Sequence, residues 1–273
     1  MTLFFPSRKR SDRPCLVVIH IPKTAGTTLR SIMEQQFSKR AMYEIYDQHR
    51  KFRTREQLMA LSPRQKAKIR LLIGHFGMDL EPHFPVPFTC YTMLRNPVEQ
   101  VLSAYAHVMH HHRKWRDRKI PLEEYLQKKK RSFNNRQARL LSGLTGQVPF
   151  GDCPAEMLDL ALANIDKKFC TVGIAEQFDQ SIYLLARLQG WADPYYVREN
   201  VSSHRLKSSD LSAETAEWIR ALNAIDIALY ERVKARFCAL WQHQDDDFHA
   251  GFARFQVENA EYMKRHQPKV VWK

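Results

Sequence analysis

The stretch "CLVVIHIPKTAGTTLR", residues 15–30, decides the fold. Cys15 to Ile21 is a continuous apolar run of strand length, which is typical of a strand buried on both faces in a parallel sheet. The segment from Thr27 to Phe37 then places apolar side chains at helical spacing. Together these features predict a strand, a tight turn and a helix.

The turn between this strand and helix has the composition of an anion site. Pro22 stiffens its entry, Lys23 lies inside it, and Gly26 permits a close or left-handed backbone before Thr27 and Thr28 open the helix. Backbone N–H groups at a helix start, with hydroxyls and a lysine, bind anions. An ordinary turn with threonine capping is the alternative, but capping does not require the lysine. The nucleoside-triphosphate loop needs lysine directly after its second glycine, and here lysine precedes the glycine.

Further apolar runs predict more strands, at residues 70–75, 88–94 and 170–174. Helical spacing is clearest from Pro97 to Met109, and the last third of the chain is mainly helical, at residues 177–188, 213–224, 229–241 and 248–263. This order predicts an α/β fold with a mostly parallel central sheet flanked by helices and a helical C-terminal third. We expect one domain over residues 1–273, with a core at about 15–191 and a helical part at about 205–265.

The stretch "CYTMLRNPVEQVLSAYAH", residues 90–107, is a second candidate binding element. Arg95 ends the predicted strand, Asn96 suits the helix N-cap, and Pro97 suits the first helical position. Ser103 lies two turns into the helix, off its apolar stripe. An arginine at a strand end binds phosphate in bidentate fashion, although a structural pairing with a buried carboxylate explains it equally well.

His75 follows the predicted strand at residues 70–75, in "LIGHFGM". An imidazole titrates near neutral pH and suits a general base, whereas a satisfied structural histidine is the plain alternative.

The charge is strongly positive, with 43 Lys and Arg against 29 Asp and Glu, a net +14. Residues 110–139 alone hold 11 basic and 3 acidic side chains, which favours a polyanionic ligand or, alternatively, marks only a solvated basic face.

Five widely spaced cysteines without a CxxC pair suggest neither a disulfide framework nor a zinc site. The acidic run "DDDFH", residues 245–249, is explained by a helix N-terminus, and the spacing of His107 and His111 by a surface helix, so we expect no metal.

The pair "PKTAGTTL" and "LRNPVEQVLSAY" resembles the two nucleotide-binding elements of sulfotransferases that use 3′-phosphoadenosine-5′-phosphosulfate, PAPS. It looks most like the carbohydrate branch with the heparan sulfate 2-O-sulfotransferases, and "FNNRQARLLSG", residues 133–143, also looks like a segment of such relatives. The resemblance implies a P-loop-like fold and a set of residues for the 5′-phosphosulfate, namely Lys23, Thr24, Ala25, Gly26, Thr27 and Thr28. It also implies that Arg95 and Ser103 bind the 3′-phosphate.

In the same branch a histidine at the place of His75 is the base, and Lys23 would stabilise the leaving group. The implied reaction moves a sulfuryl group from PAPS to a hydroxyl of a carbohydrate and releases adenosine 3′,5′-bisphosphate, and an acidic glycan is one candidate acceptor. A small-molecule kinase and a non-enzymatic polyanion-binding protein are the alternative interpretations.

Since no signal peptide or membrane span is seen, we expect a cytoplasmic protein, without a nucleic-acid partner. The oligomeric state and the acceptor stay open.

Overall fold

A computed structural model describes residues 14–46, 52–111, 117–198 and 206–266. At its centre is a five-stranded sheet in the order β2-β3-β1-β4-β5, and its strand pairings are parallel. The strands are β1 (Cys15–Ile19), β2 (Met42–Ile45), β3 (Leu71–Gly74), β4 (Phe88–Leu94) and β5 (Phe169–Ile174). The predicted α/β class with a parallel sheet is therefore confirmed.

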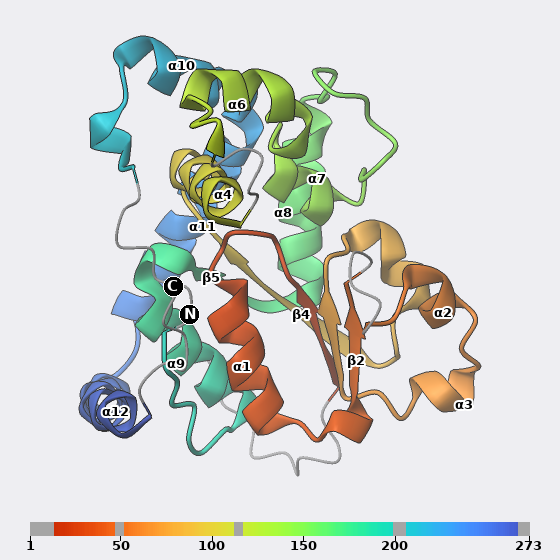
Figure 1. The fold of residues 1–273 in the computed structure, drawn as a ribbon. Helices are drawn as coiled ribbons and strands as arrows, with labels where there is room; N and C mark the ends of the chain where they lie inside the picture. The colour runs from red at the N-terminus through yellow and green to blue at the C-terminus, as the bar shows by residue number, and fades with distance from the viewer. Residues whose placement is uncertain (1–13, 47–51, 112–116, 199–205, 267–273) are drawn as a thin grey trace.

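Helices cover the sheet, and Figure 1 shows α1 in front of it, α2 and α3 beside β2, and α4, α6 and α10 gathered beyond one end. Within the described ranges, none of the helices has the length and apolarity that crossing a membrane requires. The helices are α1 (Gly26–Gln36), α2 (Arg55–Met59), α3 (Pro63–Lys66), α4 (Pro97–His111), α6 (Leu122–Lys129), α7 (Arg136–Ser142), α8 (Glu156–Lys168), α9 (Phe178–Gln189), α10 (Ala213–Leu222), α11 (Ala224–Gln242) and α12 (Asp246–Arg265).

The start of α4 follows the predicted chemistry. The side-chain oxygen of Asn96 accepts hydrogen bonds from the backbone N–H groups of Val98 (3.0 Å) and Glu99 (3.3 Å). Pro97 is the first helical residue, where its missing N–H costs nothing. At the other end of the chain, Asp245 accepts a bond from the backbone of Phe248 and so caps α12, which is a structural role for this acidic run.

The apolar strands form the core. Every residue of β1 is buried, as the continuous apolar run predicts for a strand between two covered faces. The same cluster of buried side chains includes Leu229 and Phe237 of α11 and Phe248 and Phe255 of α12. A second cluster joins α4, α6 and α10 through side chains such as Leu102, Leu126 and Ile219. The helical C-terminal third thus packs on the core that the sheet defines.

Candidate functional site

The carboxyl ends of β1, β3, β4 and β5 border a cleft of about 1600 Å³. Parallel strands place their carboxyl ends at one edge of the sheet, where α/β proteins bind ligands. The cleft is lined by all but one of the site residues predicted from the sequence: Lys23, Ala25, Gly26, Thr27, Thr28, His75, Arg95 and Ser103. The two predicted binding elements and the predicted base therefore share one cavity.

The turn after β1 has the backbone of an anion-binding loop. Lys23 and Ala25 both have a left-handed backbone, with φ of 69° and 65°. For residues other than glycine this conformation costs about 1–2 kcal/mol each. Left-handed residues of this kind occur in loops whose backbone N–H groups bind anions, and here they directly precede α1. Strain of this kind persists only where neighbouring groups hold it, so the contacts of the loop matter.

Side chains from the end of β4 and from the start of α4 hold the loop, together with one hydroxyl of the loop itself. The amide of Gln100 donates to the carbonyl oxygen of Pro22 (2.9 Å), and the guanidinium of Arg95 donates to that of Lys23 (2.9 Å). The hydroxyl of Thr24 turns inward to the carbonyl of Ile21 (2.8 Å), and Thr24 is only 1% exposed. Thr24 is the one predicted loop residue that does not line the cleft, and its hydroxyl has a structural partner instead.

Gln137 of α7 fixes the backbone of Arg95. Its side-chain oxygen accepts from the Arg95 N–H (3.0 Å), and its side-chain nitrogen donates to the Arg95 carbonyl (2.8 Å). Gln137 is fully buried, so both bonds lie away from water. The segment "FNNRQARLLSG", noted in the sequence only for its resemblance, thereby supports the predicted 3′-phosphate arginine.

Asp226 of α11 fixes the start of α7 in turn. Its two carboxyl oxygens accept from the backbone N–H groups of Gln137 (3.0 Å) and Ala138 (2.7 Å). Asn135, with φ of 47°, accepts from the N–H of Asp226 (3.1 Å) through its side chain. Burial raises the pKa of Asp226 to about 7, although these bonds and nearby Arg139 oppose the shift.

His75 belongs to a cluster of three rings. His20 and His75 have ring centroids 4.7 Å apart, Tyr46 and His75 4.8 Å, and His20 and Tyr46 5.6 Å. The Nδ1 atom of His20 is 2.9 Å from the Tyr46 hydroxyl. His20 and Tyr46 both line the cleft, and sequence reasoning missed them. The one available signal was a histidine near the end of an apolar run.

The cleft carries several cations besides Lys23 and Arg95. Arg30 is paired with Glu44 (2.6 Å) and Glu34 (2.7 Å). Arg136, the first residue of α7, donates to the carbonyl of Ser132 (3.4 Å) and, among the described residues, has no carboxylate within ion-pair distance. Its side chain is therefore available for an anion in the cleft.

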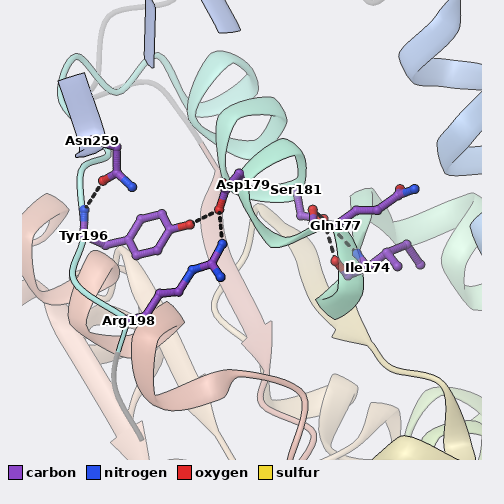
Figure 2. A network of polar contacts seen from close by, with 7 residues as sticks. All are labelled: Ile174, Gln177, Asp179, Ser181, Tyr196, Arg198 and Asn259. Carbon is purple, nitrogen blue, oxygen red and sulfur yellow. Dashed lines mark hydrogen bonds and ion pairs between the residues drawn. The ribbon is translucent and has the colours of Figure 1, made fainter. Parts of the chain in front are cut away.

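Figure 2 shows a network of polar contacts around the start of α9, which follows β5. Asp179 of α9 accepts bonds from the hydroxyl of Tyr196 and from Arg198, whose distance is 3.1 Å. Ser181 closes the turn after β5 through the backbone of Ile174 and Gln177. Asp179 and Arg198 line the cleft as a pair, so their charges largely balance each other.

The basic run of residues 110–139 is described in part, since residues 112–116 lie outside the described ranges. His110, Lys129 and Arg136 of this run line the cleft, as expected for a run that follows the helix of Ser103. Across the described ranges, no group of three or more His, Cys, Asp or Glu side chains is arranged to hold a metal ion.

A parallel α/β sheet brings a turn with a left-handed backbone, a strand-end arginine and a histidine together in one cleft, and such proteins bind ligands at this edge of the sheet. Residues 4–270 match the family model described as Galactose-3-O-sulfotransferase. The chain therefore belongs to this sulfotransferase family. The resemblance read from the two sequence motifs is confirmed at this level.

Individual relatives agree with the family. Human "Galactose-3-O-sulfotransferase 3" is 27% identical over 87% of this chain and 59% of its own length. Chicken "Heparan-sulfate 6-O-sulfotransferase 2" is 25% identical over 66% of this chain and 52% of its own length. The chain thus spans little more than half the length of these relatives. A solved sulfotransferase from Alicyclobacillus acidocaldarius aligns with a TM-score of 0.45 and 16% identity, over 85% of this chain and 97% of its own.

Proposed function

We propose that this protein transfers the sulfuryl group of PAPS to a hydroxyl of a carbohydrate, with His75 as general base. The observation that carries the proposal is the meeting of the Lys23–Thr28 loop, Arg95 and His75 in one cleft at the carboxyl edge of the sheet. Membership in the sulfotransferase family supports the same reaction.

The donor would lie across the ends of β1 and β4. The N–H groups of the loop and the Lys23 ammonium would bind the 5′-phosphosulfate, because the left-handed residues turn the N–H groups toward an anion. Arg95 and Ser103 would bind the 3′-phosphate. The Arg95 guanidinium already contacts the loop carbonyl of Lys23, so one side chain would link both ends of the nucleotide.

The reaction would be an in-line displacement at sulfur. The acceptor oxygen forms the new S–O bond, His75 takes the hydroxyl proton, and the bond to the 5′-phosphate oxygen breaks. Lys23 offsets the charge that develops on this phosphate, and adenosine 3′,5′-bisphosphate leaves. Because positioning and charge neutralisation dominate such transfers, the fixed backbone of the site matters as much as its charges.

The acceptor is proposed to be a carbohydrate, in keeping with the galactose and heparan sulfate names of the relatives. Arg136 would contact an anionic oxygen near the reacting atoms, since it lines the cleft and has no carboxylate partner among the described residues. An acidic acceptor therefore suits the cleft, in agreement with the positive charge of the chain.

Thermal unfolding with nucleotides tests the donor. Adenosine 3′,5′-bisphosphate should stabilise the protein by about 2.7 kcal/mol at 100 times its Kd. For a domain of this size each kcal/mol raises Tm by about 2–4 °C. ATP lacks a 3′-phosphate for Arg95 and should shift Tm far less. Equal shifts would favour a kinase, and heparin binding that ignores the bisphosphate and vanishes with salt would favour a polyanion-binding protein.

Transfer of labelled sulfate from PAPS tests the acceptor. Neutral, uronate-bearing and aminosugar glycans form the panel, and phenols are the contrasting class. Labelling of phenols alone would overturn the carbohydrate assignment while leaving the donor assignment in place.

A further inference from the structure

We infer that His20 is a positioning residue, fixed by Tyr46 as a neutral imidazole, that sets the distance between the base His75 and the Lys23–Thr28 loop. The inference rests on the proposed function of His75 and of this loop. It adds two residues, His20 and Tyr46, to which no role in the reaction is assigned above.

The three rings are brought together by the register of the sheet. Ile19 pairs with Gly74, and Gly74 pairs with Ile45, across β1, β3 and β2. The next residue on each strand is His20, His75 and Tyr46. The ladder continues to this row, because the N–H of His20 donates to the Gly74 carbonyl (2.9 Å) and that of His75 to the Ile45 carbonyl (2.9 Å). Neighbouring residues of a row point to the same face of a sheet, so the rings meet.

The His20 ring also contacts the anion loop. A methyl group built on Gly26 would lie 1.6 Å from the Nε2 atom of His20, which is an impossible distance. Gly26 is therefore required by the ring packed against it. The same ring meets His75 at 4.7 Å. One side chain thus touches both the loop that would bind the leaving phosphosulfate and the base that would receive the proton.

The hydrogen bond to Tyr46 selects the tautomer of His20. Burial raises the pKa of the Tyr46 hydroxyl, so it remains a neutral phenol with a proton to donate. If Tyr46 donates to Nδ1, the proton of His20 lies on Nε2, beside the anion loop. The other tautomer would place a lone pair of electrons against a bound anion. The N–H is the favourable choice there, as a hydrogen-bond donor in a site for phosphate.

The surroundings keep His20 uncharged. Its pKa falls to about 3, first because of burial and then because of the positive charges of His75, Arg30, Arg136 and Lys23. When His75 takes the proton of the acceptor hydroxyl, it becomes a cation. The neighbouring His20 ring carries no positive charge that would repel this cation. A neutral, hydrogen-bonded ring can therefore support a base without competing for the proton.

Removal of the Tyr46 hydroxyl is the sharpest test. In Tyr46→Phe we expect kcat for sulfate transfer to fall about tenfold and the acidic limb of the pH–kcat profile to move, while the Kd of adenosine 3′,5′-bisphosphate stays within twofold. Tyr183→Phe is the matched control, since its hydroxyl donates to the Phe248 carbonyl (3.3 Å) and Tyr183 does not line the cleft. Unchanged kcat and pH profile in Tyr46→Phe would overturn the inference.

Imidazole nitrogen NMR gives a readout that needs no turnover. We expect the His20 signals of the full chain to show a neutral ring protonated on Nε2 down to about pH 5, and a mixture of tautomers in Tyr46→Phe. A proton on Nδ1 in the wild type would refute the assignment. If the chain transferred no sulfate, this NMR pattern would still report on the tautomer of His20. Failure of the proposed function can therefore be told apart from failure of the inference about His20.

The contact with Gly26 is tested by a double-mutant cycle. Gly26→Ala should weaken bisphosphate binding more than tenfold, because the new methyl group meets His20. Adding His20→Ala should restore at least half of that loss, measured as the logarithm of Kd. If the losses of bisphosphate affinity in the two single variants simply added up in the double variant, the contact would be contradicted.

Discussion

His75 is the residue on which the proposed chemistry depends most directly. His75→Ala should lower kcat by roughly 10² or more, since a positioned general base contributes about that much. The Tm shift with adenosine 3′,5′-bisphosphate should persist, because the proposed nucleotide contacts come from the loop and from Arg95. The control is His243→Ala, an exposed histidine at the end of α11 that bonds the Ala239 carbonyl. Turnover close to that of the wild type would exclude His75 as the base.

At this scale the sequence predicted residues that belong to motifs and missed those that depend on strand register. Lys23 was predicted because it lies in a turn whose capping needs no lysine, and Arg95 because it ends a strand; both line the cleft. The inward hydroxyl of Thr24 was not predictable, since a turn of that composition allows either direction. His20 and Tyr46 meet only because three strands share a row, which no local pattern encodes.

At the scale of elements, α7 supports the proposed cofactor site through one buried side chain. Gln137→Ala would leave the N–H and carbonyl of Arg95 without their partners, and an unsatisfied buried group costs about 1–3 kcal/mol. We expect the Kd of adenosine 3′,5′-bisphosphate to rise at least tenfold. The Kd of adenosine 5′-monophosphate should change less, because it has no 3′-phosphate for Arg95 to bind.

Calorimetric titration of both nucleotides measures this difference, and Gln147→Ala, an exposed glutamine in the loop after α7, is the control. An equal loss for the two nucleotides would mean that Gln137 supports the fold as a whole rather than the position of Arg95.

Strands and helices were predictable where an apolar pattern ran long enough. The strand at residues 88–94 and the start of the helix at Pro97 agree with the structure. β2 was missed because it has only four residues, and Glu44 interrupts its apolar pattern. Its strand character comes from pairing with β3, which is a contact distant in sequence. The helix α7 was missed for a similar reason, since its start is fixed by Asp226 of α11, which is distant in sequence.

For the whole molecule, Asp226 connects pH to stability, because it ties the helical C-terminal third to the segment that holds Arg95. The folded state keeps this proton up to about pH 7, whereas an unfolded aspartate releases it near pH 4. Between these values the folded state binds more protons than the unfolded state. The contribution of Asp226 to the free energy of unfolding is therefore largest below about pH 4 and falls as pH rises to about 7.

Asp226→Asn removes this dependence. The amide oxygen can accept from one N–H of α7, but the amide nitrogen faces the other, so the variant should be less stable at low pH. Denaturant unfolding at pH 5, 6, 7 and 8 should show the gap between wild type and variant at its widest near pH 5 and narrowing toward pH 8. His20, whose depressed pKa acts in the opposite direction, is present in both proteins and cancels in the comparison. A gap that widens with pH would mean that the buried carboxylate is stabilised as an anion by the start of α7.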